Sequence, residues 1–272
     1  MLIRRHTVLV RITHWINFLC LAVLLGSGLG IFNGWPALYW GQATVFTRPL
    51  LAMYALPDGA GGETGITQIG QRKFTTTGWF GLSSGADGQP VVRGFPAWAT
   101  IPGPLSLALA RTWHFFFAWI FVINGAVYAA FALASRHLWR DLVPSLRQLR
   151  GIGGSIGDHL RLRFPKGEAA RHYNVLQKIS YLVVMFGMLP LMVATGLTMS
   201  PWMDAAWPWL LDVFGGRQSA RTIHFVTAFA LLLFFLVHVA MVLLAGPWNE
   251  LRSMVTGRYR IANAKDGNDA RT

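Results

Sequence analysis

Four long apolar runs alternate along the chain with segments in which charged and polar residues gather. A run of about 20 apolar residues spans the hydrocarbon core of a bilayer when it is helical. We therefore predict an all-α membrane protein with a bundle of four transmembrane helices, at residues 12–32, 112–135, 179–203 and 222–248. Together with their connections they are predicted to form one domain at 1–260, followed by a disordered polar tail at 261–272.

The longest connection, residues 33–111, joins the first two predicted helices and is rich in Gly and Pro. Its apolar stretch 45–56 is too short to cross a bilayer, so we predict a helix that lies in the membrane interface. Residues 202–214 receive the same interpretation. The connection is thus predicted to be a long outer loop that contains no fifth span.

Positive charge gathers on one side of the predicted membrane. The segments that contain the two termini, together with residues 136–178, hold 17 Lys and Arg, against 7 in the segments on the other side. Such an excess marks cytoplasmic segments, so both termini are predicted to be inside and residues 33–111 outside. The formal net charge of +13 does not indicate nucleic-acid binding, because the basic residues flank apolar runs and do not form one exposed face. Basic residues in these positions are typical of a protein that lies in a lipid bilayer.

The chain has a single cysteine, Cys20, which lies inside the first apolar run. One thiol cannot form an internal disulfide, a four-cysteine iron–sulfur site or a covalent Cys-x-x-Cys-His haem attachment. A haem in this protein would therefore be held non-covalently, through His or Met.

Two histidines, His224 and His238, lie fourteen residues apart in the fourth run, which is otherwise almost purely apolar. Fourteen helical steps of about 100° end about 40° short of whole turns, so both imidazoles lie on one stripe, about 21 Å apart along the axis. Ionisable residues inside a membrane are costly and indicate a function.

Two further histidines match these in predicted depth. His14 begins the first run on the inner side, and His114 begins the second run on the outer side. We therefore predict an inner pair, His14 with His238, and an outer pair, His114 with His224. Imidazole is a common axial ligand of haem iron, and two imidazoles leave the iron without an open position, which favours electron transfer. The other histidines, in basic inner segments, are interpreted as surface residues: His6, His137, His159 and His172.

An arginine precedes three of the four histidines by three residues: Arg11, Arg111 and Arg221. Positions i and i+3 share a helix face, and a guanidinium can pair with a haem propionate. The alternative is that these arginines only flank the helices at the membrane surface. Arg111 and Arg221 lie on the predicted outer side, where the positive-inside rule gives no reason for an arginine.

Several glycines follow the histidines, and their interpretation stays open: Gly26, Gly28, Gly30 and Gly125. A glycine lets a flat macrocycle approach the backbone, but it is also common where membrane helices pack together.

Two other classes of protein use intramembrane histidines. A transporter or proton channel with a histidine relay needs polar residues across the middle of the membrane, and the middles of the second and fourth runs are largely apolar. A zinc hydrolase needs clustered ligands and a carboxylate base, and none of the four runs contains Asp or Glu. The histidine relay is kept as the alternative function.

Taken together, these motifs resemble the bacterial di-haem cytochrome b family. The resemblance rests on the R-x-x-H start of the first run, RTWHFFFAWIF in the second, RHYNVLQKISY and TGLTMSP in the third, and RTIHF with LVHVAMVLLAG in the fourth. This family includes membrane subunits of formate dehydrogenase, nickel–iron hydrogenase and thiosulfate reductase. The stretch YNVLQKISY is most similar to the thiosulfate-reductase-type branch, and the resemblance covers the four runs.

The resemblance implies two non-covalent b-type haems in a bacterial inner membrane. It also implies electron exchange between the quinone pool and a periplasmic catalytic subunit, often a molybdopterin enzyme, reached directly or through an iron–sulfur or haem subunit. In the formate dehydrogenase relative the quinone lies beside the inner haem. That implies a quinone site here near Asn17, Tyr173, Asn174 and Gln177; alternatively, these side chains cap the third helix or face lipid headgroups.

Overall fold

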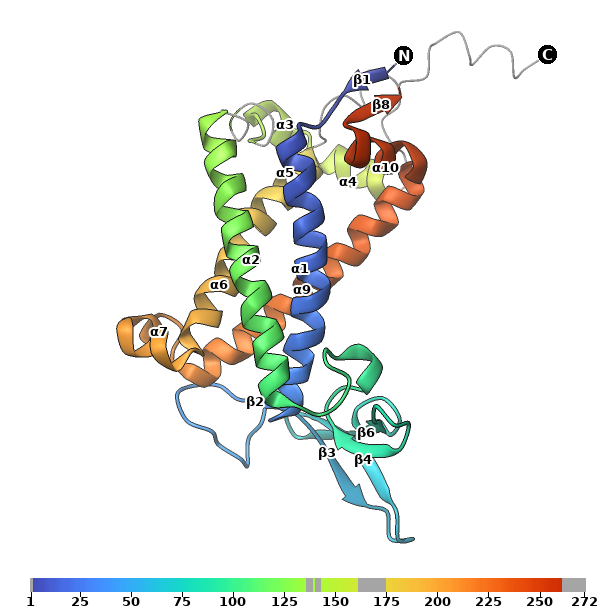
Figure 1. The fold of residues 1–272 in the computed structure, drawn as a ribbon, viewed down its shortest axis with the longest axis vertical. Coiled ribbons are helices and arrows are strands. Elements are labelled where there is room, and N and C mark those ends of the chain that lie inside the picture. The colour runs from blue at the N-terminus through green and yellow to red at the C-terminus, as the bar shows by residue number, and fades with distance from the viewer. Residues whose placement is uncertain (1, 136–138, 140–142, 161–174, 261–272) are drawn as a thin grey trace, which may run out of the picture. The chain divides into compact units, whose positions relative to one another are not determined.

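The computed structural model describes residues 2–135, 139, 143–160 and 175–260. Figure 1 shows the fold as a ribbon. The chain divides into two compact units, which are described separately below. One comprises Met1–Ile16, Asn124–Pro190 and Phe229–Thr272, and the other comprises Asn17–Ile123 and Leu191–Ala228. The predicted tail at 261–272 lies outside the described residues.

Four helical segments are long and apolar enough to cross a membrane. They are α1 (Val8–Asn33), α2 (Leu107–Ala134), the third segment (Val175–Thr198) and α9 (Arg217–Ala245). The third segment consists of α5 (Val175–Leu182), a π-helical turn η4 (Val183–Met188) and α6 (Leu189–Thr198). The prediction of four spans is therefore confirmed, and all four segments begin four or five residues earlier than their apolar runs.

The long helices leave most of their apolar side chains uncovered by protein. On α9, for example, Leu233 and Leu243 are 63% and 60% exposed. In water such surfaces would be costly, whereas the hydrocarbon core of a bilayer covers them without loss. With four such helices, the chain is a multi-pass membrane protein.

The outer segment does not contain the helix predicted at 45–56. It forms six strands instead: β2 (Ala37–Leu38), β3 (Leu51–Pro57), β4 (Glu63–Ile69), β5 (Arg72–Thr75), β6 (Gly81–Ser84) and β7 (Pro90–Arg93). The first four make an antiparallel sheet in the order β2-β3-β4-β5, in which Met53 pairs with Thr67, and β6 and β7 form a hairpin. A 3-10 turn, η1 (Ala97–Ala99), follows.

The turn between β3 and β4 explains why this segment is a hairpin. Gly59 and Gly61 adopt positive φ, which other residues rarely do. The Asp58 carboxylate accepts hydrogen bonds at 2.8 Å from the backbone N–H groups of Ala60 and Gly62. These bonds hold the pKa of Asp58 below its usual range. The Asp58 side chain and the two glycines together fix a tight reversal of the chain direction. Such a reversal belongs to a hairpin and not to an interfacial helix.

The strands gather beside the C-terminal end of α1 (Figure 1) and share an apolar core with the helices. Phe32 of α1 packs with Met53 and Phe95, and Phe225 of α9 packs against the same cluster. Phe32 and Phe225 have ring centroids 4.8 Å apart. The strands therefore share their core with the C-terminal end of α1 and with the start of α9, which carries His224.

A buried arginine fastens the connection between this sheet and α1. Arg93 is 2% exposed, and its guanidinium donates to the carbonyl oxygens of Phe95 and Gly103 and to the Thr100 hydroxyl, at 2.6 to 3.1 Å. Burial lowers its pKa. The loop held in this way docks on α1, where the N–H of Ile101 donates to the Gly26 carbonyl at 3.0 Å.

Two of the glycines in the first run serve this packing. A Cβ on Gly26 would lie 2.9 Å from the Ile101 side chain, and one on Gly30 would lie 3.1 Å from the Ala110 methyl and 3.2 Å from the Ile101 carbonyl oxygen. A side chain at Gly30 would therefore press on the Ile101 backbone more tightly than in an ordinary contact, and backbone does not move aside easily.

The segment before α9 is helical, as predicted for 202–214, but it is broken into α7 (Pro201–Ala206) and α8 (Trp209–Val213) by Pro208. The outer loop then fixes the start of α9. The Ser219 hydroxyl accepts from the N–H of Gly41 at 2.7 Å, and the Thr222 hydroxyl donates to the Tyr39 carbonyl at 2.6 Å.

The unit that contains the termini adds shorter elements to the helices. These are β1 (Leu2–Arg4), α3 (Leu146–Arg150), α4 (Ile152–Leu160), α10 (Pro247–Thr256) and β8 (Arg258–Arg260). Strands β1 and β8 pair antiparallel, so the beginning of the chain lies against the segment that follows α10.

Candidate functional site

The outer histidines face each other. His114 lies on α2 and His224 on α9, and their ring centroids are 6.3 Å apart with the ring planes at 62°. An imidazole nitrogen binds a metal such as zinc at about 2.0–2.1 Å, and it lies roughly 1 Å from the centre of its own ring. Two imidazoles on opposite sides of one metal therefore have centroids about 6 Å apart. The observed separation fits a metal held between the two rings.

Each outer histidine has a hydroxyl at its Nδ1 atom. Ser27 Oγ of α1 lies 3.0 Å from His114 Nδ1, and Thr195 Oγ1 of α6 lies 2.9 Å from His224 Nδ1. Both hydroxyl-bearing residues are fully buried. The two contacts are equivalent. A hydroxyl on the first span contacts the histidine of the second span, and a hydroxyl on the third span contacts the histidine of the fourth.

These contacts set which ring nitrogen carries the proton. The Ser27 hydroxyl donates to the Val23 carbonyl at 2.6 Å, and the Thr195 hydroxyl donates to the Leu191 carbonyl at 2.7 Å. Since each hydroxyl has one hydrogen, its oxygen can only accept from the imidazole. Nδ1 is therefore protonated, and the lone pair of Nε2 is available to bind a metal.

A glycine follows each hydroxyl residue and lies against the same ring. A Cβ on Gly28 would be 3.5 Å from His114 Cε1, and a Cβ on Gly196 would be 3.5 Å from His224 Cε1. Sequence reasoning missed Ser27, Thr195 and Gly196. The signal was present, because the tripeptides SGL at 27–29 and TGL at 195–197 repeat one pattern in the first and third runs.

The inner histidines form a second pair with the same separation. His14 of α1 and His238 of α9 have ring centroids 6.3 Å apart, with their planes at 65°. Phe234 stacks beside His238 at 6.1 Å, and Trp15 contacts the His14 ring edge-on at 5.6 Å. Asn124 donates to the Thr13 carbonyl at 2.9 Å, which ties α2 to α1 next to His14.

The three arginines have different surroundings. Arg111 is exposed, with its guanidinium 5.7 Å from the centre of the Phe115 ring. Arg221 donates to the Trp35 carbonyl and lies 5.6 Å from the centre of the Phe32 ring, which fixes its direction. Arg11 lies against Gly257, where a Cβ would be 2.8 Å from its Nη1. Their pairing with propionates stays a prediction.

The predicted quinone residues are described only in part. Asn17 lies on α1 and Gln177 on α5, and both are half-buried. Tyr173 and Asn174 lie outside the described residues, as do His137 and His172. The quinone site therefore stays a prediction.

Within residues 2–135, 139, 143–160 and 175–260, no three His, Cys, Asp or Glu residues lie together as metal ligands would. A catalytic zinc site usually has three protein ligands. The part of the chain that is described thus offers pairs of imidazoles, which suit the two axial positions of haem iron.

Comparisons with known proteins agree with this chemistry. The chain is 35% identical over 149 residues to the "Putative protein-methionine-sulfoxide reductase subunit YedZ1" of Azospira oryzae, which covers 55% of this chain and 71% of the relative. No solved structure matches. A family described as "Prokaryotic cytochrome b561" matches residues 5–257, and such a cytochrome implies haem b. Because that match extends over nearly the whole sequence, the chain belongs to the prokaryotic cytochrome b561 family.

Proposed function

We propose that this chain is a di-haem cytochrome b that carries electrons across a bacterial inner membrane, between the quinone pool and an oxidoreductase subunit in the periplasm. The observation that carries the proposal is the pair of matched histidine sites. In each of them two imidazoles from different helices lie 6.3 Å apart, which is the separation that one metal between them requires.

The residues assigned to the haems follow from these contacts. His114 and His224 would hold the outer haem, and His14 and His238 the inner one. When bound, a haem supplies one-electron chemistry, and two imidazoles leave no position on its iron for a substrate. Ser27 and Thr195 keep the outer imidazoles in the tautomer that binds a metal. Arg111 and Arg221 would pair with propionates at the outer surface.

The spacing of the sites on α9 supports a route across the membrane. His224 and His238 are fourteen residues apart, a rise of about 21 Å in a helix. The residues between them are apolar apart from Thr227. A low-dielectric helix with no charged side chain between the histidines opposes ion passage, so this pattern favours electron transfer over a histidine relay.

The partner at the outer end is proposed from the family resemblance and from the relative's printed name. A reductase subunit that acts on methionine sulfoxide in proteins, of the molybdopterin type, would take electrons from the outer haem, directly or through an iron–sulfur or haem subunit. Electrons would then flow from quinol to this partner. At the inner end, Asn17, Tyr173, Asn174 and Gln177 would donate hydrogen bonds to the quinone carbonyls.

Adding a quinol to the purified, oxidised cytochrome tests this function. We expect the haem absorbance to change to that of the reduced form, and Gln177→Leu to slow this change. Ser180→Ala is the matched control, because Ser180 is exposed on the same helix. If dithionite reduces the haems and the quinol does not, the quinone link is wrong, although the haem assignment would stand.

A further inference from the structure

A pocket of about 520 Å³ lies beside the first turn of α1, in the unit that contains the termini. It is lined by Leu2, Ile3, Arg4, Arg11, Thr256 and Arg258. Its size is that of an ordinary small-ligand site. Three of the six lining residues carry a guanidinium, and none carries a carboxylate.

The placement of these arginines is unfavourable unless something negative lies among them. Arg4 and Arg258 are directly opposite each other in the β1–β8 pair, a position in which like charges destabilise a strand pair. The Nε atom of Arg11 is buried, and it has no hydrogen-bond partner among the described residues. A buried donor without an acceptor destabilises the folded protein.

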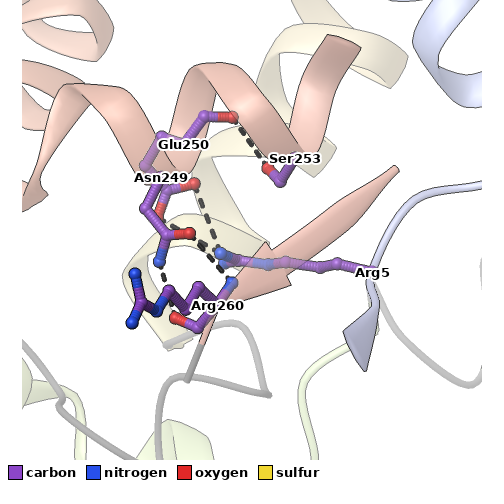
Figure 2. A network of polar contacts seen from close by, with 5 residues as sticks. All are labelled: Arg5, Asn249, Glu250, Ser253 and Arg260. Carbon is purple, nitrogen blue, oxygen red and sulfur yellow. Dashed lines mark hydrogen bonds and ion pairs between the residues drawn. The ribbon is translucent and has the colours of Figure 1, made fainter. Parts of the chain in front are cut away.

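The nearby acidic residue is already engaged by a different arginine. Arg5 contacts both carboxylate oxygens of Glu250 at 3.2 Å, as Figure 2 shows. Within the described part of the chain, the recorded ion pairs leave Arg4, Arg11 and Arg258 without a carboxylate. Among the described residues, nothing therefore compensates the positive charge of the pocket.

The pocket is also firmly built. The Asn249 side chain donates to the carbonyl of Arg260 at 2.8 Å and accepts from its N–H at 2.9 Å, which holds β8 against α10 (Figure 2). The N–H of Arg5 donates to the Gly257 carbonyl at 2.9 Å. On α1, Trp15 Nε1 donates to the Met254 carbonyl at 3.2 Å. The elements that carry the three arginines are thus fixed to one another.

We propose that this pocket binds the phosphodiester of an anionic membrane phospholipid, such as phosphatidylglycerol. Guanidinium groups match the geometry of phosphate oxygens. Two observations favour a lipid as the source of the phosphate. The pocket lies at the end of a membrane-spanning helix, where lipid headgroups gather. Leu2 and Ile3 also offer an apolar wall for the glycerol and acyl region of a lipid. A zwitterionic lipid fits less well, because its cation would approach three arginines.

Lipid binding at this pocket does not require the haems. A haem propionate is nevertheless a second possible anion here, because it presents the same oxyanion chemistry and Arg11 is three residues from His14. Free phosphate is a third source. The experiment therefore separates the three. Delipidated protein in neutral detergent would be titrated with phosphatidylglycerol, phosphatidylcholine or inorganic phosphate, and binding read from the rise in thermal unfolding temperature.

The expected result is that phosphatidylglycerol stabilises the protein at lower concentration than the other two ligands. Arg258→Gln should weaken its binding at least about fivefold, the effect of one arginine near an anionic membrane surface. Arg252→Gln is the control, since it removes the same charge from an exposed position of α10 outside the pocket. Circular dichroism checks folding, and Arg4→Gln replaces Arg258→Gln if that variant unfolds.

Three outcomes would overturn the proposal. Equal effects of Arg258→Gln and Arg252→Gln would mean that only general surface charge attracts the lipid. Inorganic phosphate that binds as tightly as phosphatidylglycerol would mean a site for free anions. A shifted midpoint potential of the inner haem in Arg258→Gln, with unchanged lipid binding, would place a propionate in the pocket.

Discussion

Replacing Thr195 with valine tests how the outer histidine pair is oriented. The change keeps the shape of the side chain and removes the hydroxyl that lies 2.9 Å from His224 Nδ1. Thr195 is fully buried, so water cannot take the place of the hydroxyl. The imidazole then loses one of the acceptors that hold its ring and its tautomer.

The size of the effect follows from what remains around the ring. A buried donor left without an acceptor costs about 1–3 kcal/mol, and loss of such a partner of a metal ligand typically weakens metal affinity about 10–100-fold. The Met192 carbonyl also accepts from His224, so part of the interaction survives. We therefore expect a loss near the lower limit, about tenfold, or about 1.4 kcal/mol.

Haem titration of the apoprotein, followed by absorbance, measures this loss. Thr198→Val is the matched control, because Thr198 is buried on the same helix and its hydroxyl donates to the Thr195 carbonyl at 2.6 Å instead of a histidine. Unchanged haem affinity and midpoint potential in Thr195→Val would refute the assigned orientation, as would equal losses in both variants.

Three further changes test separate parts of the account. His238→Ala should remove the inner haem and lower the haem content by about half, measured per chain in a pyridine haemochrome assay; equal loss of both haems in a folded variant would contradict the pairing. Gly30→Ala should lower stability by about 1–3 kcal/mol in thermal unfolding, because the added methyl meets backbone; an unchanged unfolding temperature would show that the loop is not held there. The lowered pKa of Asp58 means that its turn is stabilised above the usual Asp range and loses this support as the pH falls through the lowered value. The protection of the Ala60 and Gly62 amides, taken as their exchange rate relative to that of an unstructured chain at the same pH, should therefore fall only in acid, and Asp58→Asn should remove most of that pH dependence; equal protection at neutral and acid pH in the unaltered protein would count against the turn.

The spans and the histidine pairs were predictable because both depend on one helix period and on membrane thickness. Run lengths located the helices, and the depth of each histidine along its run identified its counterpart. The contacts of Ser27 and Thr195 could not be predicted in the same way. They depend on the rotation of α1 and α6 about their axes, which is set by packing against neighbouring helices.

The outer sheet could not be recognised from hydropathy. The residues of β3 are continuously apolar, and Ala52 and Met53 are both buried although they are neighbours in sequence, so the strand shows no alternation. The better signal was the turn sequence after Pro57, DGAGG, in which an Asp and several glycines favour a chain reversal.

The haem content of the purified protein, measured together with its reduced-minus-oxidised spectrum, tests directly whether each chain carries two haems. We predict about two b-type haems per chain, both low-spin as expected for two imidazole ligands. A folded, fully assembled preparation that contains no haem, or a single one, would contradict it.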